Sequence, residues 1–391
     1  MKLLMIVLII STLLGGCSSE PVKKKGGPSV TIPDKISTND ASDFSYEIAD
    51  GEVKITGLIN DALQFVGVPD TIDGYPVTII GTDAFKYYDK LIAISMPDTI
   101  KKMETNSISL CFNLYSIHLP ENIEELEPWA IYGCSSLSSI TLPNSLSSIG
   151  NIHINECDSL SEIIVEKDNP YFTVVDNVLF SKDMTTLVLY PQGRSEEKYE
   201  IPDGVKTINS FAFNDNKLKE IILPEGLETI LSYNFNVQNI EELSIPASVT
   251  LIDDYFCNFT KKLININVDE DNPNYTSIDG VLFDKNVSTL IKYPGSKIEE
   301  QYTVPDTVKV ISRSAFQNLK HTKKVILKEG VEELMYDAFA ENSKMEIHIP
   351  ASVTEINNIF FLGEDNVIIT PKGSQAEQYA IDNSIAYKTT N

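Results

Sequence analysis

Apolar residues return at fixed positions around a series of prolines along most of this chain. Counting from each proline, an apolar residue stands one and three positions before it and three, six and eleven positions after it. The intervals between these prolines are 22 or 23 residues, apart from two of 59. With Lys328 standing where another proline is due, the series is Pro97, Pro120, Pro143, Pro202, Pro224, Pro246, Pro305 and Pro350. A period of about 20 to 29 residues is typical of leucine-rich-repeat solenoids.

Each period predicts one coil of a solenoid. The alternation before the proline predicts a short strand with one buried face. A single coil cannot bury its apolar side chains, but stacked coils share a continuous core, with parallel strands about 4.8 Å apart. We expect short helical or 3-10 turns between the sixth and eleventh positions. The chain is therefore predicted to be β-rich, with a parallel sheet on one face.

One phrase occurs twice, 103 residues apart: DNPYFTVVDNVLF (Asp168–Phe180) and DNPNYTSIDGVLF (Asp271–Phe283). The two copies lie in the 59-residue intervals, each of which is an ordinary coil plus an enlarged one at about 166–201 or 269–304. In both, VLF is followed by a polar turn and by TLVLYP or TLIKYP. We expect hairpins that project from the solenoid.

Both ends of a solenoid need caps, because they would otherwise expose core and unpaired strand edges. The Asp50-Gly51 turn predicts a hairpin over Phe44–Ile59, within an N-terminal cap of about 44–68. The stretch Ile369–Lys388 predicts a strand, a short helix and a last strand, within a C-terminal cap of about 369–391. Residues 43–391 are accordingly expected to form one domain.

The first forty residues predict export and a lipid anchor. An apolar run after Lys2 is too short to cross about 30 Å of hydrocarbon, which favours a signal peptide. Leu14-Gly15-Gly16-Cys17 resembles a bacterial lipobox, in which the cysteine is acylated and the chain is cut just before it. We therefore expect a signal peptide over 1–16, lipidation of Cys17 and a flexible linker over 17–42. An incidental cysteine after an ordinary signal is the alternative.

Several longer motifs resemble one family. They are SSLSSITLPNSLSSIG, DGVLFDKNVSTLIKYP, TIDGYPVTIIGTDAF and PKGSQAEQYAIDNSIAYK, and they resemble the BspA-type leucine-rich repeat surface proteins of bacteria over about Phe44 to Lys388. The resemblance implies a right-handed solenoid capped at both ends, and a role like that of the best-known members in adhesion and host-protein binding. The family fixes no ligand-binding residues, so the resemblance transfers none.

Composition and charge argue against several classes of function. The formal net charge of -25 makes nucleic-acid binding unfavourable. Cys111, Cys134 and Cys157 recur every 23 residues, so they form a column of core thiols that cannot converge on a metal. His118, His153, His321 and His348 have no nucleophile or acid clustered with them, and the acidic runs lack a calcium-loop pattern. We expect no catalytic residue, metal or cofactor.

Binding through the surface is the function that remains. The outward positions two before each proline form a candidate binding row on the sheet: Ser95, His118, Thr141, Ile222, Ser244, Thr303, Ile326 and His348. Aromatic residues also gather in the first third, including Trp129, which is either a recognition residue or core. We expect a lipid-anchored protein outside the bacterial cell that binds a host or neighbouring-cell protein or glycan. The alternatives are a structural or envelope-assembly lipoprotein that binds self components and, more distantly, a carbohydrate-active enzyme.

Overall fold

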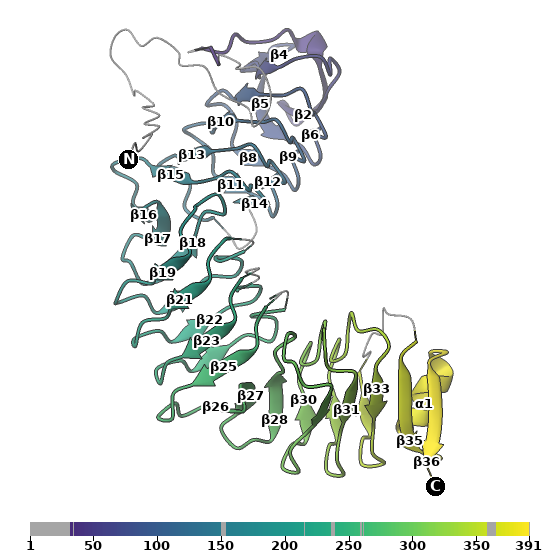
Figure 1. Ribbon diagram of the computed structural model, residues 1–391. Helices are drawn as coiled ribbons and strands as arrows, with labels where there is room; N and C mark the ends of the chain where they lie inside the picture. Colours follow the sequence, from purple (N-terminus) through teal and green to yellow (C-terminus); the bar gives the residue numbers. More distant parts are fainter. Residues whose placement is uncertain are drawn as a thin grey trace, which may run out of the picture.

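The chain folds into a β-solenoid whose stacked coils follow a bent path (Figure 1). The computed structural model describes residues 32–33, 35–149, 154–214, 216–235, 239–258, 260, 262–357 and 365–390. The expected signal peptide, Cys17, His153 and most of the linker lie outside the described residues. The predicted fold class, a repeat solenoid built on parallel strand pairing, is confirmed.

The strands before the prolines form the first ladder, in which neighbouring coils pair in parallel within each hydrogen-bonded stretch. Alternate side chains point inward, so Ile94 and Ile117 are buried while Ser95 and His118 point outward. The ladder runs in five hydrogen-bonded stretches rather than as one sheet. They are β3 (Phe65–Gly67), β7 (Ala93–Ser95) and β10 (Ser116–His118); β13 (Ser139–Leu142) and β15 (Glu162–Val165); β19 (Lys198–Glu200) and β21 (Glu220–Ile222); β23 (Glu242–Ile245) and β25 (Asn265–Val268); and β29 (Gln301–Thr303), β31 (Lys324–Ile326), β33 (Glu346–His348), β35 (Val367–Pro371) and β36 (Ala386–Thr390).

A second ladder lies five and six positions after the prolines, where the apolar pattern had predicted the start of helical turns. Its strands are mostly two residues long, and the apolar residue at the sixth position faces the core. They are β2 (Glu52–Leu58), β5 (Tyr75–Ile80), β8 (Lys102–Met103) and β11 (Glu125–Leu126); β18 (Thr186–Leu189), β20 (Thr207–Ile208), β22 (Thr229–Ile230) and β24 (Leu251–Ile252); and β28 (Thr289–Lys292), β30 (Val310–Ile311), β32 (Glu333–Leu334) and β34 (Glu355–Ile356). Parallel sheets therefore cover more than one face.

The segment up to the eleventh position is also not helical. In the coils before the first meander this position forms a third parallel ladder of β6 (Phe85–Lys86), β9 (Ile108–Ser109), β12 (Ile131–Tyr132) and β14 (Ile154–Asn155). In later coils it lies in hydrogen-bonded turns. Within the described residues, helices occur only near the two ends of the chain, as the 3-10 helix η1 (Ala41–Asp43) and the α-helix α1 (Gln375–Asp382). Each short coil satisfies its backbone by pairing with its neighbours, so helical bonds are not needed.

The enlarged coils do not project from the solenoid, and that expectation was wrong. Each forms an antiparallel meander, whose third strand joins the second ladder in parallel. The first meander is β16 (Phe172–Val175), β17 (Val178–Ser181) and β18, and the second is β26 (Tyr275–Ile278), β27 (Val281–Asp284) and β28. Val178, Leu179 and Phe180 are all fully buried, because both faces of β17 are covered.

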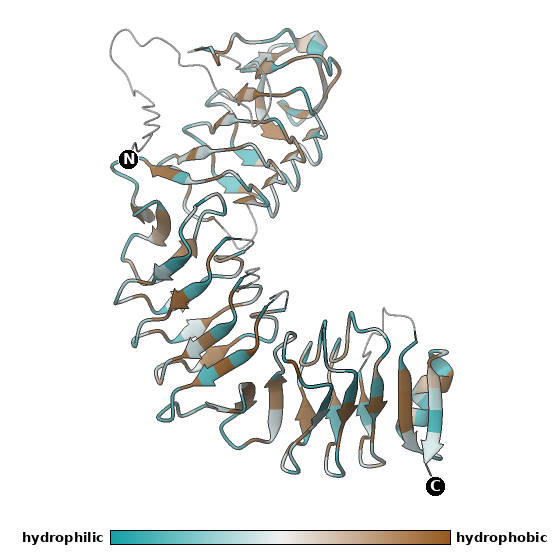
Figure 2. Cartoon of the chain, viewed as in Figure 1, coloured by the Kyte–Doolittle hydropathy of each residue, from teal (hydrophilic) through white to brown (hydrophobic). Residues whose placement is uncertain are grey.

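These meanders divide the interior into three hydrophobic cores. Leu179 packs into the first core, whereas its neighbours Val178 and Phe180 pack into the second. In the same way, Leu282 belongs to the second core and Phe283 to the third. Figure 2 shows apolar residues on many strands of the stacked coils and polar residues on the connecting turns. The path of the solenoid changes direction near each meander (Figure 1).

The two ends close the solenoid with different elements. At the N-terminal end, β1 (Phe44–Ala49) pairs antiparallel with β2 through Asp50 and Gly51, both with positive φ, and β4 (Thr71–Ile72) pairs with β5. At the C-terminal end, α1 is capped by the hydroxyl of Ser374 and buries Ala376 and Ala380 against the third core. The last strand, β36, pairs in parallel with β35.

Candidate binding surface

The candidate binding row is present on the first ladder, but as separate groups. His118 aligns with Ser95, and Ile326 aligns with both Thr303 and His348. The remaining three, Thr141, Ile222 and Ser244, each sit in a different stretch of the ladder. His118, Ser244 and Thr303 are exposed and the other five are half-buried. The structure thus offers short patches in register rather than one continuous row.

The last of these patches carries charged side chains on two neighbouring strands, β31 and β33. The Nε2 atom of His348 lies 2.5 Å from Oε1 of Glu346, and Nζ of Lys324 lies 2.9 Å from the same oxygen. Hydrogen bonds from His348 and Lys324 lower the pKa of Glu346 to about 2. Glu346 is therefore an anion held between two basic groups, next to the apolar Ile326.

Similar ion pairs join successive coils elsewhere. Lys198 lies 2.8 Å from Glu220, and Lys206 lies 2.8 Å from Glu228. Both pairs are more than half exposed, so each contributes only about 0 to 1 kcal/mol to stability. Some of the acidic side chains thus pair with lysines of the neighbouring coil on the solvent-exposed surface.

A tight turn follows the second ladder, and its third residue has positive φ in most described coils. The amide of the fourth residue donates to the carbonyl of the first, as from Ala130 to Glu127 at 3.0 Å. This is the pattern of a type II turn, which favours glycine or asparagine in third place. The residues found there, which we call the corner residues, are Asp83, Asn106, Trp129, Phe211, Tyr233, Ser314 and Asp337, with φ between 52° and 59°.

Three corner residues are bulky aromatics, for which this backbone is strained at a cost of order 1 to 3 kcal/mol. Phe211 and Tyr233 recover part of that cost, because their rings stack with centroids 4.7 Å apart. Tyr233 also stacks on Tyr255, at 5.6 Å. We call the coils around the first, second and third hydrophobic cores the first, second and third segments. The second segment therefore carries an aromatic stack that joins three coils.

Trp129 is different, because it forms no ring pair within the described part of the chain and its side chain is 39% exposed. Pro128 precedes it and has its own φ fixed by the pyrrolidine ring. Of the aromatic residues that the sequence placed in the first third, Tyr88 is half-buried and its hydroxyl bonds to the Leu58 backbone. Trp129 is thus an exposed, strained aromatic residue.

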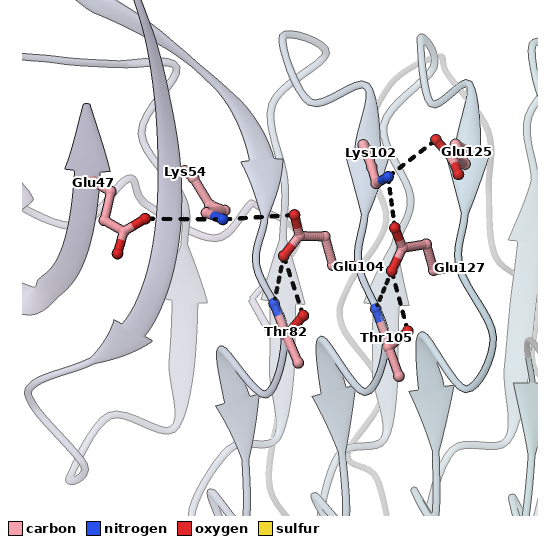
Figure 3. Close-up of polar contacts among 8 residues, drawn as sticks. All are labelled: Glu47, Lys54, Thr82, Lys102, Glu104, Thr105, Glu125 and Glu127. Atoms are coloured by element: carbon pink, nitrogen blue, oxygen red, sulfur yellow. Dashed lines mark hydrogen bonds and ion pairs between the residues drawn. The ribbon is translucent and has the colours of Figure 1, made fainter. Parts of the chain in front are cut away.

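A charged network holds the backbone beside two of the corner residues (Figure 3). The carboxylate of Glu104 accepts hydrogen bonds from the amide and hydroxyl of Thr82, at 2.9 and 3.2 Å. Glu127 accepts the same two bonds from Thr105, at 2.9 and 3.1 Å. Each threonine directly precedes a corner residue, so each glutamate fixes a corner of the preceding coil.

Lysines complete this network. Lys102 lies 2.6 Å from Glu127 and 3.3 Å from Glu125, and the hydrogen bond from Lys102 is the largest cause that lowers the pKa of Glu127. Lys54 lies 3.7 Å from Glu104 and 3.9 Å from Glu47 (Figure 3). The sequence pattern did not predict contacts among these lysines, glutamates and threonines. The one indication was a glutamate seven positions after each of two successive prolines.

The cysteines behave as core residues. Cys111, Cys134 and Cys157 are buried, as expected, and so is Cys257; none of the four forms a disulfide. Burial raises the pKa of Cys157 and of Cys257 to about 12. Within the described ranges, no three or more His, Cys, Asp or Glu side chains are grouped so that they could hold a metal ion.

Comparison with known proteins identifies the family. The model of the BspA type leucine rich repeat region matches residues 69–186, 192–302 and 294–390, in six copies. Among solved structures, the pneumococcal vaccine antigen PcpA has 19% identity and a TM-score of 0.40, covering 91% of this chain and 99% of its own. A leucine-rich cell surface protein of Faecalibacterium prausnitzii has 18% identity and a TM-score of 0.40, covering 92% and 100%.

A leucine-rich repeat protein of Bacteroides ovatus has 18% identity and a TM-score of 0.38, covering 89% of this chain and 98% of its own. No curated protein matches the sequence. In the part of the chain that the structure describes, no helix is long and apolar enough to span a membrane. Because the family model covers well over half of its residues, the chain belongs to the BspA-type leucine-rich repeat family.

Proposed function

We propose that this protein is a non-enzymatic binding protein at the bacterial cell exterior, tethered through a lipid on Cys17. It binds a protein or glycan of a host or neighbouring cell through the outer surface of its coils. Family membership and the lipobox-like Leu14-Gly15-Gly16-Cys17 support this location and role. The observation that carries the proposal is the patch of β29, β31 and β33, where outward side chains stand in register.

In this patch Thr303, Ile326 and His348 lie side by side on one face. The patch combines an apolar side chain with hydroxyl, imidazole and charged groups, a mixture that protein surfaces use for recognition. Neighbouring strands hold these groups about 4.8 Å apart, so little order has to be created on binding.

The test is to screen the purified full-length chain on arrays of extracellular-matrix proteins and glycans, and to repeat the screen with Ile326→Asp. We expect at least one defined ligand, whose affinity falls tenfold or more in the variant. Asn267→Asp, at an exposed position of β25 outside the candidate row, is the matched control and should retain binding. Absence of any ligand, together with unchanged cell attachment in a deletion strain, would contradict the proposal.

A further inference from the structure

The corner of the first segment carries side chains that the fold itself does not require. Asp83, Asn106 and Trp129 occupy the same turn position in three successive coils, with φ of 56°, 54° and 58°. Aspartate and asparagine tolerate this backbone, whereas a tryptophan there is an outlier. Strain of this kind points to function when the surrounding packing does not account for it.

Packing accounts for only part of Trp129. With 39% of its surface exposed, it gains burial from the rest of its side chain, but less than the fully buried aromatic rings of the core do. In the second segment, by contrast, the stacking of Phe211 on Tyr233 offsets the cost of the same backbone strain. Trp129 has no such ring among the residues the structure describes.

Two of the three corner positions, those of Asp83 and Asn106, are also held by hydrogen bonds from the residue before them. Glu104 fixes Thr82, directly before Asp83, and Glu127 fixes Thr105, directly before Asn106 (Figure 3). The carboxylates of this network are themselves fixed by Lys54 and Lys102. A row of side chains on a fixed backbone loses little entropy when a ligand binds.

The chemistry of the row fits a sugar. The amide of Asn106 can both donate and accept hydrogen bonds, and the carboxylate of Asp83 accepts them. Lys86 adds a donor, with its Nζ 2.9 Å from Oδ1 of Asp83. An indole ring offers a flat apolar face to the C–H groups of a pyranose, while the polar groups meet its hydroxyls. A protein partner would instead need an interface of about 800 Å² per side, with an apolar centre.

We propose that Trp129, Asn106 and Asp83 form a binding site for an oligosaccharide, with Trp129 as the stacking platform and the other two as hydroxyl partners. This inference rests on the proposed binding function and names a site away from the first ladder. Successive corner residues are about one strand spacing apart, comparable to the length of a sugar ring along a glycan chain.

The experiment uses the fact that Trp129 is the single tryptophan of the chain. The purified full-length protein is screened on an array of neutral hexose and N-acetylhexosamine oligosaccharides, and the hits are titrated by tryptophan fluorescence. We expect saturable binding that shifts or quenches the emission. Asn106→Ala should weaken the affinity tenfold or more.

Trp129→Asn separates recognition from folding. Asparagine is the residue of the preceding coil at this turn, so the variant should keep or raise the melting temperature while it loses saccharide binding on the array. Phe112→Asn is the matched control, because Phe112 is 45% exposed in the same segment but lies off the corner. It should leave binding unchanged.

Two results would overturn the site: no saccharide binding on this array, or binding that survives Trp129→Asn. A defined ligand that is lost in Ile326→Asp but kept in Trp129→Asn would overturn this inference alone and leave the proposed function standing.

Discussion

Asn169 and Asn272, 103 residues apart, share three hydrogen bonds, and Asn272 adds a fourth to the Val249 carbonyl at 3.0 Å. Each is fully buried, and each side-chain amide donates to the carbonyl of a proline in the preceding coil, Pro143 or Pro246, at 3.0 and 2.9 Å. Each side-chain oxygen accepts from the backbone amides two and three residues later. In both copies of the repeated sequence, this asparagine therefore joins the enlarged coil to the preceding coil.

Asn272→Ala is expected to lower the free energy of unfolding by about 2 to 3 kcal/mol, because it leaves buried carbonyls and amides without partners. Calorimetric melting would measure this loss. Asn274→Ala is the control, since its side chain makes one exposed hydrogen bond and should matter by less than about 1 kcal/mol. Equal losses in the two variants would contradict the fastening role.

Lys292→Leu is expected to stabilise the protein at neutral pH. Its amine is buried, with one hydrogen bond to the Ser314 carbonyl at 2.8 Å, and burial lowers its pKa. Replacing a buried charge with an apolar side chain often gains about 1 to 4 kcal/mol. The first enlarged coil already has Leu189 at the equivalent place.

The dependence of stability on pH tests whether the buried charge of Lys292 is the cause of this difference. Because the folded chain holds this proton less tightly than the unfolded chain, stability rises with pH from the folded pKa towards the ordinary value of 10.5. The advantage of Lys292→Leu should therefore shrink as the pH approaches 10.5. Lys285→Leu, at an exposed lysine of the same meander, should change stability by no more than about 0.5 kcal/mol. A constant difference between Lys292→Leu and the parent would refute the explanation.

Glu346→Gln is expected to remove a small acid sensitivity. The folded-state pKa of about 2 lies below the ordinary 4.5, so the stabilisation is complete above pH 4.5 and disappears as the pH falls towards 2. The effect should stay under about 1 kcal/mol, because the side chain is 39% exposed. Carboxyl titration by NMR measures the pKa directly, and a value near 4.5 would disprove the pairing with His348 and Lys324.

Cys17→Ala is expected to abolish lipidation. Cells expressing the parent chain should incorporate radiolabelled palmitate into the protein, and the variant should not. The variant should also leave the membrane fraction, since no other anchor is proposed. Label retained in the variant would assign the lipid elsewhere.

The apolar columns predicted the coils well, because stacked coils bury the same position repeatedly. Ile94 and Ile117 illustrate this, since one spacing rule placed both in the core. The role of Val178-Leu179-Phe180 was harder to read. An unbroken apolar run shows that both faces are covered, but it does not say by which parts of the chain.

The corner was missed for a different reason. Glu127-Pro128-Trp129-Ala130 has proline where a type II turn favours it, but tryptophan is a poor indicator of positive φ. The network of Lys102, Glu104 and Glu127 depends on the rotation of each coil relative to the next. That rotation follows from the parallel pairing of the second ladder, which the spacing of residues in the sequence does not reveal.

The double-sided strands β17 and β27 also affect how the molecule would respond to stretching. Pulled apart at its ends, a solenoid yields coil by coil, each releasing about 22 residues or roughly 70 Å of contour. A meander whose middle strand packs into a hydrophobic core on each side should resist this stepwise unfolding. We therefore expect force spectroscopy to show extension in three stages, separated by the two points at which a meander must unfold.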